Sequence, residues 1–117
     1  MPRRVLIIDD NGPFRAAARQ LLERAGFVVV AEATTGLSGI EQAQIHRPDV
    51  AIVDVQLPDC DGFEVAARLP ASVHVILISS LDSADFGALV ASSSALGFIP
   101  KADLSAAAIE ALLAPAQ

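Results

Sequence analysis

The sequence predicts an α/β fold, in which a parallel β-sheet carries helices on both of its faces. Short apolar runs recur along the chain, and segments with the spacing of amphipathic helices separate them. The runs are nearly continuous and are bounded by polar, Gly or Pro residues, as expected for strands that are buried on both faces. Such alternation favours right-handed crossovers between parallel strands. With 117 residues and 53% hydrophobic content, residues 1–117 are expected to form a single domain.

Five runs are predicted to be strands because each is short, apolar or β-branched, and ends at a polar residue or a turn former. They are residues 5–8, 27–31, 50–53, 73–78 and 97–100. The fifth ends in Pro100, which has no N–H to donate to a neighbouring strand. This strand is therefore expected at an edge of the sheet.

The helix that follows the first strand is the best defined in the sequence. Its apolar positions repeat at i, i+3, i+4 and i+7 from Phe14 onwards. Asn11 is the expected N-cap, Pro13 stands near the first helical position, and Gly26 ends the pattern. Asp103 is the expected N-cap of the last helix. The remaining helices are predicted over residues 37–46, 63–69, 83–94 and 104–113.

The composition argues against several classes of function. The formal net charge is −6, so direct binding of nucleic acid is not expected. Cys60 is the only cysteine, which excludes an internal disulfide and a zinc site of paired cysteines, and favours the cytoplasm. Cys60 itself is expected to be an exposed loop thiol. The apolar runs fall far short of the roughly 18–20 residues that a membrane span needs, so no membrane association is expected.

Reactive side chains stand at the carboxyl ends of four predicted strands. Asp9 and Asp10 follow the first strand, and Asp54 follows the third. Ser79 ends the fourth, and Lys101 follows the fifth. Parallel α/β sheets bind ligands at this edge, near the point where strand order reverses. Each residue alone could serve as a cap, a turn or a surface charge, but their combination predicts a functional site.

Three carboxylates would converge at this edge if the first and third strands are neighbours. Such groups ionise near pH ~4, and like charges held this close either raise a pKa or require a cation. Mg²⁺ prefers oxygen ligands and is typically held by one or two carboxylates together with a phosphate group. The sequence thus predicts a site that presents Mg²⁺ to a phosphoryl group. Asp54 would be the nucleophile, with Lys101 and Ser79 contacting the phosphoryl oxygens.

At these positions the sequence resembles the receiver domain of two-component response regulators. The resemblance covers essentially the whole chain and rests on four motifs in order. They are IIDD at 7–10, DVQLPDCDGFE at 54–64, ILISS at 76–80 and GFIPK at 97–101. The resemblance implies a flavodoxin-like (βα)5 fold, a doubly wound five-stranded parallel sheet with strand order 2-1-3-4-5.

Roles for the acidic residues follow from this resemblance. Asp54 would be the phosphoacceptor and would take a phosphoryl group from a phosphohistidine of a sensor histidine kinase. Asp10 would bind Mg²⁺ directly and Asp9 through water, and the backbone carbonyl of Gln56 would supply a further ligand. Lys101 would pair with Asp54 before the transfer and with the phosphoryl group after it.

The resemblance also implies a conformational switch made by Ser79 and Phe98. The Ser79 hydroxyl would move toward the phosphoryl oxygen, and the Phe98 ring would turn inward behind it. Phe98 has no hydroxyl to hold its ring in water, so an inward bias is expected even without phosphate. The lifetime of the phosphoryl group is expected to depend on Gln56 and Leu81.

The run KADLSAAAIEALL at 101–113 resembles receivers that are joined to a helix-turn-helix output domain, which implies control of transcription. The first helix would face the kinase. A homodimer, if one forms, would use helix four, strand five and helix five, or helices one and five. The chain would act on itself by Mg²⁺-dependent phosphorylation and dephosphorylation, and it is not expected to be an enzyme with an outside substrate.

Two other families with related chemistry fit these residues less well. A phosphatase of the haloacid dehalogenase type needs a second Asp two residues after its nucleophile, where this chain has Gln56. A flavodoxin needs a phosphate loop rich in Ser, Thr and Gly, whereas Asp9 and Asp10 would repel the phosphate. A receiver that takes no phosphate and serves only as a protein-interaction module remains the alternative.

Overall fold

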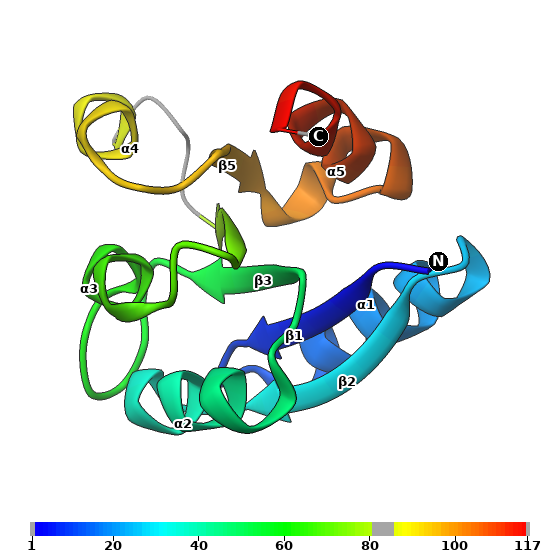
Figure 1. The fold of residues 1–117 in the computed structure, drawn as a ribbon, viewed down its shortest axis with the longest axis horizontal. Coiled ribbons are helices and arrows are strands. Elements are labelled where there is room, and N and C mark those ends of the chain that lie inside the picture. The colour runs from blue at the N-terminus through cyan, green and yellow to red at the C-terminus, as the bar shows by residue number, and fades with distance from the viewer. Residues whose placement is uncertain (1, 81–85, 117) are drawn as a thin grey trace.

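The computed structural model describes residues 2–80 and 86–116 and contains one five-stranded sheet in the order β2-β1-β3-β4-β5 (Figure 1). All neighbouring strands are parallel. The strands are β1 (Arg4–Ile8), β2 (Val28–Ala33), β3 (Val50–Asp54), β4 (His74–Ser79) and β5 (Gly97–Pro100). The predicted fold class and strand order are confirmed, and β5 lies at an edge as its proline requires.

In the described part of the chain, five α-helices connect or follow these strands. They are α1 (Gly12–Arg24), α2 (Gly36–His46), α3 (Gly62–Arg68), α4 (Gly87–Ser92) and α5 (Ala106–Leu113). Short 3₁₀ turns, Lys101–Asp103 and Ala114–Ala116, precede and follow α5. The predicted cap of α1 is confirmed, because the Asn11 side chain accepts a hydrogen bond from the Phe14 amide at 3.0 Å.

The fourth helix is shorter than the sequence predicts. The expectation was a helix over residues 83–94, of which 83–85 lie outside the described residues. In the described part, α4 ends at Ser92 because Ser93 has an extended backbone. The Ser93 hydroxyl then accepts a hydrogen bond from the Ala95 amide at 3.2 Å, which stabilises the turn into β5.

The predicted N-cap of the last helix was wrong. Ser105, and not Asp103, accepts the hydrogen bond from the backbone N–H of Ala108, at 3.0 Å. Asp103 is taken up in the 3₁₀ turn that follows β5, and Leu104 after it is extended. Because Leu104 and Ser105 both have extended backbones, α5 begins at Ala106.

Two apolar layers lie on opposite faces of the sheet. Helices α1 and α5 cover one face, where Ala18, Leu22, Ile109 and Leu113 pack against alternate strand residues such as Ile7 and Ile52. Helices α2, α3 and α4 cover the other face, where Leu6, Ile8, Ala51 and Val53 point. The central strands are therefore buried on both sides, which explains their continuous apolar runs.

The register of β1 and β3 brings their carboxyl ends to the same level. Ile8 pairs with Val53, so the next residues, Asp9 and Asp54, lie side by side at the edge of the sheet. The Asp9 amide still donates to the carbonyl of Ala33 at 3.0 Å, which extends the backbone pairing to the site. The central position of these strands gives the two carboxylates a rigid support.

Candidate functional site

The buried polar residues of the described chain are all at one edge of the sheet. They are Asp9, Asp54 and Ser79, with 0%, 5% and 0% of their surfaces exposed. Each lies at or directly after the carboxyl end of a strand. Burial of charged groups costs free energy unless they are paired, so this concentration marks the edge as the candidate site.

Asp9 and Asp54 are held in the same way. The Oδ1 atom of each accepts a hydrogen bond from a backbone N–H two residues on, from Asn11 at 2.8 Å and from Gln56 at 3.0 Å. The Oδ2 atoms both face the ammonium of Lys101, at 2.8 Å for Asp9 and 3.1 Å for Asp54. One lysine thus bridges the two central strands of the sheet. The structure brings together Asp9, Asp54 and Lys101 as the sequence predicts.

The electrostatics of the site depend on this shared cation. Burial raises the pKa of Asp54 above its usual value, and the charge of Asp9 adds to this, although the amide of Gln56 and the ammonium of Lys101 oppose it. Burial works to lower the pKa of Lys101, but its contacts with the two carboxylates outweigh that effect and raise it. Lys101 is therefore a fixed positive charge at neutral pH.

The oxygens at this edge fit a divalent cation. Oxygen atoms of Asp9, Asp10 and Asp54 lie within 4.8 Å of one another. Asp9 Oδ2 is buried and lies 2.8 Å from the ammonium of Lys101. Asp10 is exposed and keeps one side open to water. A hard cation that retains several waters, such as Mg²⁺, suits such a set of carboxylates.

Replacement of Asp10 by Ala is expected to weaken Mg²⁺ binding by about tenfold or more, since loss even of groups that only support ligands costs 10–100-fold. The side chain is exposed and not part of the core, so the fold should stay intact. Calorimetric titration with Mg²⁺ measures the affinity, and circular dichroism checks the fold. An unchanged affinity in a folded variant would contradict the assignment of Asp10 as a ligand.

The remaining predicted site residues lie on β4 and β5 or follow a strand in the sequence. Ser79 is buried at the end of β4, level with Pro100. Phe98 is half-buried and its ring lies 5.8 Å from that of Phe86, centroid to centroid. Leu81 lies outside the described residues. The switch by Ser79 and Phe98 and the metal ligation by the Gln56 carbonyl stay predictions.

The loop from β3 to α3 is tied to two helices. Asp61 caps α3 by accepting a hydrogen bond from the Glu64 amide at 2.9 Å. Asp59 accepts hydrogen bonds from the amides of Gly36 and Leu37 at the start of α2, at 2.8 and 3.0 Å. These amides lower the pKa of Asp59. Asp59 therefore links the loop that follows Asp54 to α2.

Cys60 differs from the expectation of an exposed loop thiol. Its side chain is half-buried and packs against the layer formed by α2 and α3. Burial, followed by the charge of Asp59, raises the pKa of the thiol. A thiol in this state is less reactive than a free one.

Gly62 stands where no larger residue fits. A Cβ atom at this position would lie 2.6 Å from the carbonyl oxygen of Asp54 and 2.9 Å from the Cα of Val55. The amide of Gly62 donates to the carbonyl of Val55 at 2.8 Å. The close approach packs the start of α3 directly on the backbone that presents Asp54.

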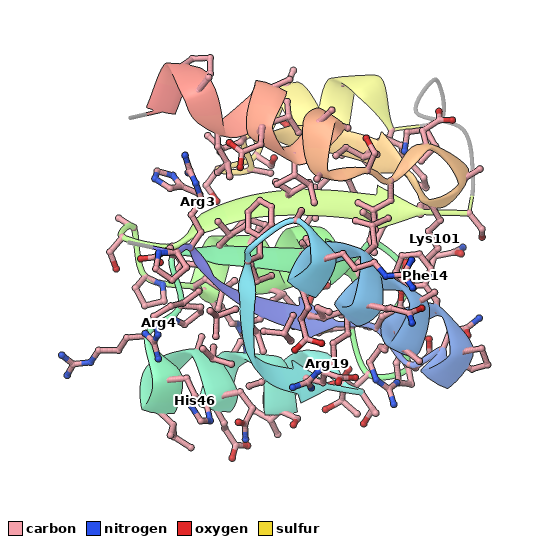
Figure 2. All side chains as sticks on the ribbon, turned by 90° about the vertical axis from the view of Figure 1, so that its right-hand side faces the viewer. Arg3, Arg4, Phe14, Arg19, His46 and Lys101 are labelled. Carbon is pink, nitrogen blue, oxygen red and sulfur yellow. The ribbon has the colours of Figure 1, made fainter. Side chains whose placement is uncertain are left out.

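Two residues of the site were not singled out in the sequence, Phe14 and Arg15 in the first turns of α1. Lys101 Nζ lies 4.6 Å from the centroid of the Phe14 ring (Figure 2). Arg15 donates a hydrogen bond to the carbonyl of Asp9 at 2.8 Å and another to Glu32 on β2 at 3.0 Å. In the sequence, Phe14 fits the apolar face and Arg15 the charged face of α1. The only feature of the sequence that could have indicated them is their position, a few residues after Asp9 and Asp10.

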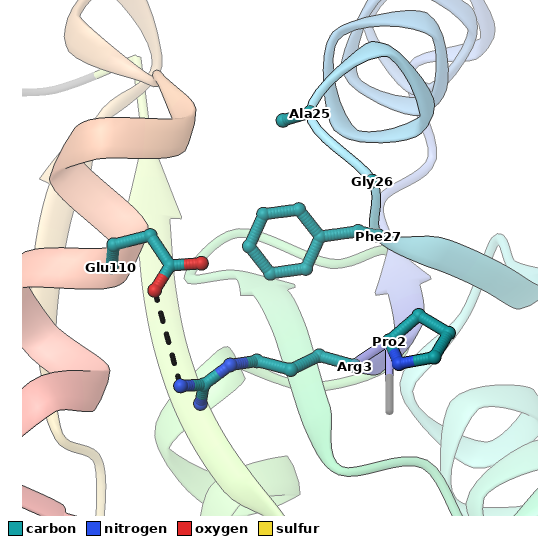
Figure 3. A pocket seen from close by; sticks show the side chains of 6 residues that line it. All are labelled: Pro2, Arg3, Ala25, Gly26, Phe27 and Glu110. Carbon is teal, nitrogen blue, oxygen red and sulfur yellow. Dashed lines mark ion pairs between the residues drawn. The ribbon is translucent and has the colours of Figure 1, made fainter.

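A hollow lies at the opposite edge of the sheet, where the strands begin. Its lining includes Arg3, Gly26 and Phe27, and Arg3 pairs with Glu110 of α5 at 3.9 Å (Figure 3). Glu110 is about half exposed, and such surface pairs contribute little free energy. This hollow holds none of the predicted site residues.

Comparisons with known proteins agree with the fold and point to one family. The family model of the response regulator receiver domain matches residues 5–113. BvgA of Bordetella pertussis, which carries the name of a transcription regulator, is 35% identical over 104 residues, 86% of this chain and 50% of BvgA. A LuxR-family two-component response regulator from Aurantimonas, of known structure, has a TM-score of 0.88 at 26% identity, covering 98% of this chain and 87% of that one.

A third relative carries a different name. A protein-glutamate methylesterase/protein-glutamine glutaminase of Alkalilimnicola ehrlichii is 38% identical over 112 residues, 90% of this chain and 29% of that protein. The chain thus spans half or less of the length of these curated relatives. Within residues 2–80 and 86–116, no helix has the length and apolar character that crossing a membrane requires.

Proposed function

This chain belongs to the family of response regulator receiver domains, and we propose that it receives a phosphoryl group on Asp54 from a phosphohistidine of a sensor histidine kinase. The observation that carries the proposal is the pair of buried carboxylates, Asp9 and Asp54, bridged by Lys101 at the carboxyl edge of the sheet. A buried Asp beside a fixed cation and a further acidic group is suited to nucleophilic attack on phosphorus.

In the transfer, an oxygen of Asp54 forms a bond to phosphorus while the bond from phosphorus to the histidine nitrogen breaks. The electron pair of that bond returns to the imidazole. Asp54 is presented by β3 and oriented by the Gln56 amide. Lys101 neutralises charge on the phosphoryl oxygens, and Ser79 donates a hydrogen bond to one of them. Asp9, Asp10, Asp54 and the Gln56 carbonyl would hold Mg²⁺, which would supply further neutralisation of those oxygens.

The phosphoryl group is proposed to act through Ser79 and Phe98, whose movement would change the surface around β5 and so control an output, transcription in the first place. The names of BvgA and the Aurantimonas regulator support this choice. The proposed setting is the cytoplasm. In this proposal, the chain phosphorylates and dephosphorylates itself and turns over no outside substrate.

Intact mass spectrometry tests the phosphoacceptor assignment. The chain is incubated with Mg²⁺ and a small phosphodonor such as acetyl phosphate, with a chelator in a parallel sample. A single added phosphoryl mass is expected with Mg²⁺ and not with the chelator, and peptide mapping should place it on Asp54. A folded chain that gains no mass would overturn the proposal and favour a receiver that only binds proteins.

A further inference from the structure

The ammonium of Lys101 is held on three sides, and only two of them are carboxylates. Asp9 Oδ2 and Asp54 Oδ2 lie 2.8 and 3.1 Å from Nζ, and the ring of Phe14 lies 4.6 Å away, from Nζ to the centroid. The side chain of Lys101 is 16% exposed. We propose that Phe14 is a positioning residue for Lys101, whose ring face holds the ammonium at the site during phosphoryl transfer. This inference rests on the proposed function.

The carboxylate contacts of Lys101 cannot stay constant through the reaction. When Asp54 takes a phosphoryl group, one of its oxygens becomes part of a mixed anhydride and the negative charge moves to the phosphoryl oxygens. Lys101 must follow that charge on a flexible stem of four carbons. The negative face of an aromatic ring attracts the cation in both states, because its quadrupole does not depend on the state of Asp54.

The ring is supported independently of the reacting groups. Phe14 lies in the first turn of α1, and its amide is held by the side chain of Asn11 at 3.0 Å. It also packs against the apolar layer under α1 and α5. Figure 2 shows Phe14 on α1 directly beside Lys101. Because the rigid ring already orders Lys101, the lysine loses less conformational entropy when it binds the phosphoryl group.

An aliphatic residue would fill the helix position equally well but would give no such attraction. The apolar spacing of α1 requires only a hydrophobic side chain at this site. Contacts between cations and rings strengthen as water is removed, and Lys101 is largely shielded. An aromatic side chain at position 14 is therefore expected to matter more for the attraction of Lys101 than for packing of the core.

A double-mutant cycle of protein stability, measured without metal or phosphodonor, tests the contact between Phe14 and Lys101. Urea unfolding is measured for the unsubstituted chain, Phe14→Leu, Lys101→Met and the double variant. Phe14→Leu is expected to raise the equilibrium constant for unfolding. The factor of this increase should be about 3 to 10 times larger in the unsubstituted background than in the Lys101→Met background. Equal effects in both backgrounds would overturn the inference.

Because Lys101→Met leaves two buried carboxylates without their cation and the variant could fail to fold, a second series keeps Lys101. Phenylalanine with one, three or five fluorines at position 14 preserves the ring shape and removes the negative charge of its face stepwise. Stability and the rate of labelling by acetyl phosphate with Mg²⁺ are expected to fall in that order, the rate by about 3- to 10-fold at five fluorines. Equal stability and equal labelling rates across the fluorinated variants at position 14 would overturn the inference.

Phe63 gives a matched control. Its ring contacts the uncharged ring of Phe86, 6.1 Å between centroids, so the same fluorination there should produce no graded loss of labelling. An equal gradient at Phe63 would show a general packing effect and overturn the inference. If the unsubstituted chain takes no label, the proposed function fails, and the two stability measurements still decide whether Phe14 holds Lys101.

Discussion

The Asp54→Asn variant is expected to take up no phosphoryl group and to be more stable than the unsubstituted chain at pH 7 in the absence of metal. An amide has no anionic oxygen to attack phosphorus, so labelling should fall below detection. The gain in stability follows from the position of Asp54, since its charge is buried beside Asp9 and near Asp10. Removing one of three neighbouring negative charges relieves both repulsion and desolvation.

The gain should depend on pH in a defined direction. Burial first, and then the charge of Asp9, raise the pKa of Asp54 in the folded chain above its ordinary value of 3.8. A raised pKa means that the folded state favours the protonated carboxyl, so the contribution of Asp54 to stability is full below pH ~3.8. It is lost as the pH rises through the folded pKa. The advantage of Asn should therefore be present at pH 7 and shrink on acidification.

Urea unfolding with a chelator at several pH values measures this, alongside intact mass after incubation with the phosphodonor and Mg²⁺. Asp103→Asn is a suitable control, because Asp103 is exposed in the turn after β5. That control should label normally and show little change in stability. Labelling of Asp54→Asn equal to that of the control would contradict the assignment of the phosphoacceptor.

Gly62→Ala is expected to destabilise the fold by about 2–3 kcal/mol, at the upper part of the range for forced overpacking. The added Cβ would meet backbone atoms, the carbonyl of Asp54 at 2.6 Å and the Cα of Val55 at 2.9 Å. Backbone in the central strand cannot move aside as the end of a side chain can. Any relief would shift the peptide that carries Asp54, so the labelling rate should fall as well.

Gly87→Ala is the matched substitution. Gly87 is exposed at the first position of α4, and a Cβ there would meet no atom of the described residues within 4 Å. Alanine at that position should leave stability unchanged or raise it by up to about 0.5–1 kcal/mol. Chemical denaturation of both variants gives the comparison. Equal stability of the two would show that β3 and α3 tolerate the added methyl group.

The features that the sequence predicted well depend on residues close together in the chain. Strand identity follows from apolar runs such as residues 50–53, and the Asn11 cap follows from the residues around it. The grouping of Asp9, Asp54 and Lys101 required one further rule, that parallel strands end at the same edge of a sheet. These predictions needed no knowledge of side-chain packing.

The features that could not be predicted depend on distances through space. Phe14 and Arg15 look like ordinary core and surface residues of α1 until β2 and the turn after β5 are in place. The cap of α5 passed to Ser105 because the 3₁₀ turn had already taken up Asp103. The close contact of Gly62 with the Asp54 backbone is likewise invisible in a pattern of residue types.

Asp9 and Asp54 each accept a hydrogen bond from a backbone amide, and these two amides can serve as spectroscopic probes of the site. The amide of Asn11 donates to one carboxylate and the amide of Gln56 to the other. The chemical shift of a donating amide responds to the charge on its acceptor, so each carboxylate has a separate reporter nucleus two residues downstream. A two-dimensional ¹⁵N–¹H spectrum of the unsubstituted chain would therefore follow events at Asp9 and at Asp54 independently and in real time, with no dye and no change to the sequence.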